Sequence, residues 1–231
     1  MIITIDGPAG SGKSTIARKL AARMGIAYLD TGAMYRAIAL EALRLGLPMD
    51  DAEAITRLAR DTEIDLDCGP THTRVVVNGA DISEAVRSMA VNNATGHVAR
   101  IQAVRDILVQ RQRQIGRQLE SLVTEGRDQG SVVFPDADLK VVMEAALERR
   151  AKRRHLEMIA DGEEADYREI LENLRERDRN DAHQWEPLLT DSRVVRLDTS
   201  ELSVAEVVER LLAEVQRRKK ERAAGVAAAR M

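Results

Sequence analysis

The segment from Gly7 to Ser14 constrains the fold more than any other part of this chain. It reads Gly-Pro-Ala-Gly-Ser-Gly-Lys-Ser and matches the phosphate-binding pattern G-x-x-x-x-G-K-[ST]. The short apolar run 1–6 precedes it, and the amphipathic stretch 15–24 follows it. Because such a loop needs a strand before it and a helix after it, we predict a strand, a glycine-rich turn and a helix.

The residue types of this loop are those that bind a polyphosphate. Glycines let successive backbone N–H groups point into one concavity, and the helix N-terminus adds partial positive charge. We expect Lys13 to reach the β- and γ-phosphates, and the Ser14 hydroxyl to bind Mg²⁺. The alternative, a turn that only joins strand to helix, gives these two side chains no packing role. The predicted phosphate-binding residues are Gly7, Pro8, Ala9, Gly10, Ser11, Gly12, Lys13, Ser14 and Thr15.

Composition narrows the class of protein. The 231 residues can bury a substantial core as one domain, and 44% hydrophobic residues are ordinary for a globular chain. A net charge of −3 argues against a dedicated nucleic-acid binder. No apolar run reaches the roughly 18 residues of a membrane span, and the strand predicted at Met1 leaves no room for a signal peptide. Cys68 is the only cysteine, which fits a reducing cytoplasm.

Apolar runs and helical spacing alternate along the chain. Further strands are predicted at 26–29, 122–124, 139–143 and 193–197, and helices at 34–45, 51–60, 83–120 and 204–215. Strands that alternate with helices indicate an α/β fold with a parallel sheet and helices on both faces. Residues 216–231 are basic and then alanine-rich, and we predict a frayed helical tail there.

The segment 62–83 differs from the rest. Its polar and apolar residues alternate, and Asn78-Gly79 follows a valine-rich run. Since Asn-Gly favours a tight hairpin turn, we predict a small antiparallel sheet inserted into the α/β chain.

Polar residues follow three of the predicted strands, at Asp6-Gly7, at 30–32 and at 126–128. Ligands of parallel α/β sheets bind beyond the carboxyl ends of the strands, so we expect these residues to line one cleft. Arg36 and Arg127 lie just past two of these ends, and arginine suits bidentate recognition of phosphate.

Two dense runs of charge lie in the C-terminal half. Residues 149–154 place Arg150, Arg153 and Arg154 on one helical face, where they would stabilise charge on a moving phosphoryl group. The same spacing fits a solvated basic face paired with acids such as Glu148. The second run, 175–181, fits an exposed, charge-laced helix without any function.

Two segments resemble the bacterial cytidylate kinase family. They are 30–36, Asp-Thr-Gly-Ala-Met-Tyr-Arg, and 126–137, Gly-Arg-Asp-Gln-Gly-Ser-Val-Val-Phe-Pro-Asp-Ala. The order of phosphate loop, tyrosine-arginine helix, sheet insertion and glycine-arginine-aspartate strand end is also similar. The resemblance runs from Ile3 to about Leu212. It implies an enzyme that transfers the γ-phosphoryl group of ATP to CMP or dCMP with Mg²⁺, usually as a monomer.

The resemblance also implies how a single domain is organised. The P-loop core would comprise 1–35, 103–148 and 185–215. A region that binds the nucleoside monophosphate would span about 36–102, and a short mobile lid about 149–184.

Individual side chains gain expected roles from the resemblance. Arg36 and Arg127 would hold the phosphate of CMP, and Arg105 and Asp128 would read the edge of its cytosine. Arg150 matches a lid arginine near the transferred phosphate, as does Arg153, and 199–203 match the region near the adenine of ATP. The implied acceptor-binding residues are Thr31, Arg36, Arg105, Arg127, Asp128, Arg177 and Asp181, and the implied catalytic residues are Lys13, Arg127 and Arg153.

The chain departs from the family at two places. The family often has a base-contacting serine near Gly96, where Thr95 is the only adjacent hydroxyl candidate. Beyond Asp181 the family has an arginine where this chain has Gln184, in a segment one residue shorter. Either one phosphate contact is absent, or Arg179 supplies it.

Transfer between phosphates needs no general base, because the phosphate of CMP is already an anionic nucleophile. The expected catalytic frame is electrostatic and consists of Lys13, Ser14 with Mg²⁺, Arg36, Arg127 and Arg153. Two alternatives remain, a kinase of another small acceptor such as UMP, AMP or a sugar acid, and a regulatory P-loop NTPase switch. The switch patterns Asn-Lys-x-Asp and Asp-x-x-Gly do not occur in the sequence.

Overall fold

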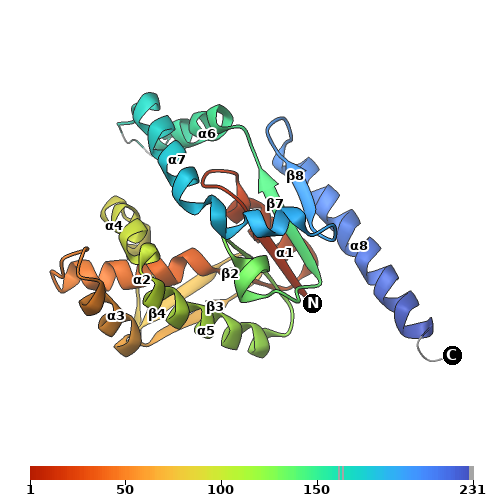
Figure 1. The fold of residues 1–231 in the computed structure, drawn as a ribbon, viewed down its shortest axis with the longest axis horizontal. Coiled ribbons are helices and arrows are strands. Elements are labelled where there is room, and N and C mark those ends of the chain that lie inside the picture. The colour runs from red at the N-terminus through yellow and green to blue at the C-terminus, as the bar shows by residue number, and fades with distance from the viewer. Residues whose placement is uncertain (161, 163, 229–231) are drawn as a thin grey trace.

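A five-stranded parallel sheet forms the centre of the molecule, in the order β2-β6-β1-β7-β8 (Figure 1). The computed structural model describes residues 1–160, 162 and 164–228. Each pair of neighbouring strands runs parallel. The predicted α/β class is therefore confirmed. The strands are β1 (Ile2–Asp6), β2 (Ala27–Asp30), β6 (Leu122–Gly126), β7 (Leu139–Glu144) and β8 (Val195–Asp198).

Helices cover both faces of this sheet. On one face, Ile3 and Ile5 of β1 pack with Leu20 of α1 (Lys13–Met24) and Leu211 of α8 (Val204–Ala228). On the other face, Leu122 of β6 lies in the same cluster as residues of α2 (Thr31–Arg44) and α5 (Gln102–Leu119). Alternate residues of a strand point to opposite faces, so a strand that is apolar on both faces needs helices on both sides.

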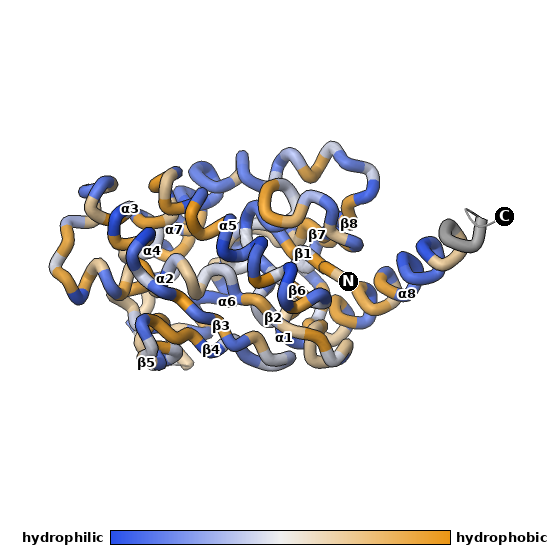
Figure 2. The backbone as a smooth tube through the Cα atoms, turned by 90° about the horizontal axis from the view of Figure 1, so that it is seen from below, coloured by the Kyte–Doolittle hydropathy of each residue, from blue (hydrophilic) through white to orange (hydrophobic). Residues whose placement is uncertain are grey.

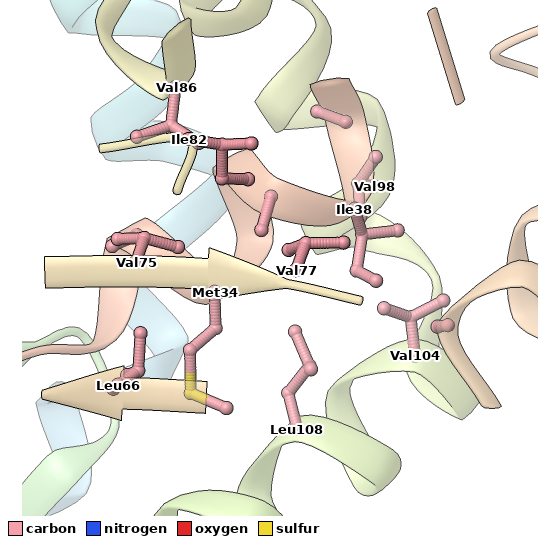
Figure 3. Packing of buried hydrophobic residues seen from close by; sticks show 14 of the residues in the cluster. Met34, Ile38, Leu66, Val75, Val77, Ile82, Val86, Val98, Val104 and Leu108 are labelled. Atoms are coloured by element: carbon pink, nitrogen blue, oxygen red, sulfur yellow. The ribbon is translucent and has the colours of Figure 1, made fainter. Parts of the chain in front are cut away.

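The predicted insertion is a three-stranded antiparallel sheet of β3 (Ile64–Cys68), β4 (Thr73–Val77) and β5 (Ala80–Asp81). Asn78 and Gly79 join the last two strands with φ of 48° and 81°, the left-handed pair that a tight hairpin turn requires. Figure 3 shows the core beneath this sheet, with valines of β4 above side chains of α2 and α5. Helix α3 (Ala52–Asp61) leads into this insertion and also packs in that cluster.

The single helical stretch predicted at 83–120 is wrong in one respect. The structure divides it into a short 3₁₀ turn η1 (Ala85–Arg87), α4 (Met89–Arg100) and α5. Ile101 has an extended backbone, with φ −79° and ψ 108°, and turns the chain between α4 and α5. Val98 and Val104 then lie in one core on either side of the break (Figure 3). Tertiary packing therefore overrides a periodicity that continues through the break.

The chain between β7 and β8 forms two helices and two short 3₁₀ turns. Ala151 of α6 and Leu174 of α7 pack on Ala9 of the glycine-rich loop, which ties this helix pair to the sheet edge. The elements are α6 (Leu147–Ala160), α7 (Tyr167–Asp181), η3 (Ala182–Gln184) and η4 (Glu186–Thr190).

The last helix is longer than the sequence indicates. The sequence predicts a helix to about Val215 and a frayed helical tail beyond it. In the structure one helix, α8, continues to Ala228, and 229–231 lie outside the described residues. Arg217 pairs with Glu214 and Glu221 at helical spacing, which stabilises this extension. Figure 2 shows α8 leaving the body of the molecule, with a hydrophilic stretch along it. None of the helices described combines the length and apolar character of a bilayer span.

Candidate active site

The glycine-rich loop runs from the end of β1 to the start of α1, as predicted. Gly7, Gly10 and Gly12 have φ of 138°, 72° and 90°, values that L side chains rarely adopt. A Cβ on Gly7 would lie 2.1 Å from the carbonyl oxygen of Met143 in β7. The loop therefore passes so close to the main chain of β7, near the carboxyl end of that strand, that only glycine fits.

Lys13, the first residue of α1, is buried with 5% of its surface exposed. Its Nζ donates to the Pro8 carbonyl oxygen at 2.7 Å and to the Ser11 Oγ at 3.5 Å. Burial, followed by the positive charge of Arg127, lowers the pKa of Lys13 well below its usual value. The ammonium is thus a desolvated cation that the loop holds by only a few dipoles.

Ser14 is exposed, and its hydroxyl donates to Oε1 of Glu125 at 2.8 Å. Glu125 lies near the end of β6 and is 8% exposed, and its carbonyl oxygen accepts from Thr31 Oγ1 at 2.8 Å. Hydroxyl and carboxylate oxygens are suitable donors for Mg²⁺, so the oxygens here fit the predicted metal. No group of three or more His, Cys, Asp or Glu that could hold a metal occurs within the described part of the chain.

Sequence reasoning did not select Glu125. Its signal was present, because an acidic residue ends an otherwise apolar strand beside the glycine-arginine-aspartate segment. The sequence does not reveal that β6 pairs with β1. This pairing brings Glu125 beside Ser14, which lies 111 residues away in sequence.

Arg36 lies in the second turn of α2, which begins directly after β2. Asp30 caps α2 by accepting from the Ala33 N–H, and its other carboxylate oxygen accepts from Arg36 Nη2 at 2.8 Å. The Arg36 Nε is buried and has no hydrogen-bond partner among the described residues. Since a buried donor is costly to leave unpaired, this guanidinium suits an added acceptor such as a phosphate oxygen.

Three predicted cations from distant parts of the chain meet near the loop. The pKa of Lys13 is lowered in part by Arg127 and Arg177. Loss of hydration, then Arg127 and then Arg154 lower the pKa of Arg177, although solvent reaches its side chain. Asp181 accepts from Arg127 Nε at 3.3 Å and offsets part of this charge. The concentrated positive charge favours a ligand with several negative charges.

Arg105 and Asp128 also meet as expected. The Arg105 Nη2 donates to Asp128 Oδ2 at 2.5 Å, and both side chains are largely buried. The Arg105 Nη1 donates to Oε1 of Gln184 at 3.0 Å. One guanidinium therefore links α5, the turn after β6 and the segment after α7.

The two arginines expected in a lid, Arg150 and Arg153, take different positions. Arg150 is 4% exposed and donates to the carbonyl oxygens of Ala145 at 2.8 Å and Ala9 at 3.0 Å, and to Asp178 at 3.0 Å. Arg153 instead donates to the carbonyl oxygen of Thr199 at 2.6 Å. Arg150 is therefore not part of a solvated basic face and does not pair with Glu148. It supports the glycine-rich loop instead.

The run 175–181 has two faces. Arg175 and Arg179 pair with exposed Glu172 at 2.7 Å and 3.0 Å. Arg177 contributes to the cation cluster, and Asp181 pairs with Arg127. The structure thus engages Arg179 with Glu172 and offers no sign that it replaces the family arginine.

The space at Gly96 is open. A Cβ there would meet nothing within 4 Å. The neighbouring Thr95 hydroxyl donates to the Val91 carbonyl oxygen at 2.6 Å, so its proton is used within α4.

Asp6, at the end of β1, is fully buried, and its two carboxylate oxygens accept from the N–H groups of Gln129 and Gly130 at 2.7 Å and 2.8 Å. Burial raises its pKa from 3.8 to about 7, outweighing these two bonds and the charge of Lys13. At pH values between 3.8 and about 7, the Asp6 carboxyl is protonated in the folded state but ionised in the unfolded state. The contribution of Asp6 to stability is therefore full below the lower value and is lost as pH rises through the upper one.

We expect the wild-type protein to lose up to about 4 kcal/mol of unfolding free energy, relative to the Asp6→Asn variant, between about pH 4 and about pH 8. Asparagine removes the titration but retains an oxygen that can accept from one of the N–H groups. Urea unfolding of both proteins across this range measures the difference. A constant difference would exclude Asp6 as the titrating group.

Comparisons with known proteins identify the family of this chain. The family model described as Cytidylate kinase matches residues 3–217. The cytidylate kinase of Caldanaerobacter subterraneus is 42% identical, over 94% of this chain and 96% of its own length. A bifunctional pantoate ligase/cytidylate kinase of a Synechococcus species is 44% identical, over 91% of this chain, which spans only 40% of that longer protein. A crystal structure of an uncharacterised protein from Eubacterium ventriosum, 14% identical over 94% of this chain and 98% of its own, has a TM-score of 0.50 and shares the fold. The chain belongs to the cytidylate kinase family.

Proposed function

We propose that this protein transfers the γ-phosphoryl group of ATP to CMP or dCMP, giving ADP and CDP or dCDP. Membership of the family supports this reaction. One observation supports the assignment of the reaction to Lys13, Arg127 and Arg177. Arg127 and Arg177 lie close enough to Lys13 to lower its pKa, and Arg127 also lowers the pKa of Arg177. Two phosphorylated ligands bound side by side would neutralise that charge.

ATP would bind with its phosphates on the loop. The backbone N–H groups of 7–15 and the N-terminus of α1 offer donors there, and Lys13 offers a cation. On binding, the ammonium would exchange the Pro8 carbonyl for phosphate oxygens. The contact of Arg153 with Thr199 supports an indirect role, in which Arg153 holds the 199–203 segment that we assign to the adenine.

CMP would bind opposite ATP, beyond the carboxyl ends of β2 and β6. The unpaired Nε of Arg36, together with Arg127, would take its phosphate. The Asp128 carboxylate would accept from the exocyclic amine of cytosine, and Arg105 would donate to its ring nitrogen or carbonyl oxygen. Uracil carries a carbonyl oxygen in place of that amine, so the same pair would repel UMP.

The oxygens of Ser14 and Glu125 fit a magnesium ion bound beside the loop, directly or through water. Bound Mg²⁺ would neutralise charge on the β- and γ-phosphates. The protein itself would align the two phosphates and exclude water, with α6 and α7 as the lid. We further propose that it acts as a cytoplasmic monomer.

A panel of acceptors tests this function. We expect kcat/KM for CMP to exceed that for UMP by more than about tenfold, which corresponds to about 1.4 kcal/mol. A ratio below this would point to the open space at Gly96 as a missing base contact. A preference for AMP over CMP would contradict the proposal, and ATP hydrolysis that ignores every acceptor would favour an NTPase switch.

A further inference from the structure

Gln184 contacts Arg105, which together with Asp128 is proposed to recognise the base. Its Oε1 accepts from Arg105 Nη1 at 3.0 Å, while Arg105 Nη2 donates to Asp128 at 2.5 Å. The two outer nitrogens of one guanidinium are therefore held by two different elements. Two such bonds fix both the position and the plane of the group.

The chemistry of the partners sets the orientation of the amide. Arginine has donors only, so the oxygen of Gln184 must face Arg105. An arginine at position 184 could not accept this bond and would place a second positive charge beside Arg105. The bond is thus specific to the glutamine of this chain and impossible for the arginine that the family resemblance leads one to expect there.

The segment that carries Gln184 is firmly supported. The Ser131 hydroxyl donates to the backbone carbonyl oxygen of Gln184 at 2.8 Å. The next residue, Trp185, is buried against Val142 and Leu188. This anchorage holds η3 at the end of α7, so that the amide is a fixed support for Arg105.

We propose that Gln184 is a positioning residue for recognition of the cytosine, acting through Arg105. This inference rests on the proposed function, in which Arg105 and Asp128 read the base. Without the amide, Arg105 keeps its bond to Asp128 but can rotate about it. The donors that the cytosine requires are then no longer held in one place, and the preference for CMP over UMP falls.

The test compares Gln184→Met, which keeps the length but removes the acceptor, with Gln184→Glu, which keeps an acceptor. We expect Q184M to lower kcat/KM for CMP about tenfold, mainly through KM, because a hydrogen bond to a charged group is lost. The KM for ATP stays unchanged, and the ratio of kcat/KM for CMP to that for UMP falls. Q184E retains most of that ratio. His183→Ala, at the exposed neighbouring position, is the matched control.

A double-variant cycle separates positioning from general support. If Gln184 acts through Arg105, Q184M has almost no further effect on CMP kinetics in an Arg105→Met background. Should Q184M melt early, Gln184→Arg provides a second variant without an acceptor. If the substitution lowers kcat/KM equally for CMP and UMP, so that their ratio is unchanged, the inference is overturned. A wild-type enzyme that does not prefer CMP would instead overturn the proposed function.

Discussion

The Lys13→Met variant is expected to lose about 10³-fold in kcat while its fold remains intact. Methionine matches the length of the buried stem but carries no charge toward the γ-phosphoryl group. The loss falls on kcat because the ammonium interacts most strongly with the charge that develops during transfer. Stability changes little, since the variant loses a bond to Pro8 but no longer buries a desolvated cation.

A coupled assay of ADP release gives kcat, and thermal melting reports the fold. Lys19→Met is the matched control, because Lys19 lies on the same helix but is exposed. We expect this control to behave as wild type. Near-normal turnover of K13M would remove Lys13 from the mechanism, and an early melting transition would assign it a structural role.

The Gly7→Ala variant is expected to be destabilised by about 4 kcal/mol or more. The backbone at Gly7 has φ of 138°, and the new Cβ would lie 2.1 Å from the Met143 carbonyl oxygen. That oxygen belongs to the main chain of β7, a strand paired on both sides, so it cannot rotate away as a side chain could. Either the loop or the sheet edge must shift. Since whole domains are stable by about 5–15 kcal/mol, the expected cost is a large fraction of the total.

Gly12→Ala separates the clash from the backbone strain. Gly12 also has a positive φ, 90°, but a Cβ there would meet nothing within 4 Å. We expect this variant to lose only about 1 kcal/mol from the strained conformation. Urea unfolding of both variants measures the difference, and equal losses would show that the contact with Met143 does not decide the choice of glycine.

Elements whose signals lie within a few residues could be predicted from the sequence. The strand, loop and first helix follow from the glycine pattern and the flanking apolar runs, and the hairpin follows from Asn78-Gly79. In each, the deciding energies are local backbone preferences. The break at Ile101 and the extent of α8 could not be predicted in this way, because one depends on packing against α2 and the other on continued helical pairing.

The site divides in the same manner. The chemical types were readable, since a lysine after glycines and arginines after strand ends indicate phosphate binding in any similar sheet. The partners were not readable. The contact of Ser14 with Glu125 and that of Arg105 with Gln184 join residues 111 and 79 positions apart. Likewise, only the packing of α7 separates Arg177, in the cation cluster, from Arg179, which pairs with Glu172.

The sequence by itself determined that this chain builds a phosphate-binding loop at the edge of a parallel sheet, because backbone conformation and burial follow from adjacent residues. Tertiary structure alone decided which charges face one another, which remain unpaired, and that the Gln184 amide contacts Arg105. Electrostatic energies depend on distances between side chains and on their hydration, and both arise only when remote segments pack together.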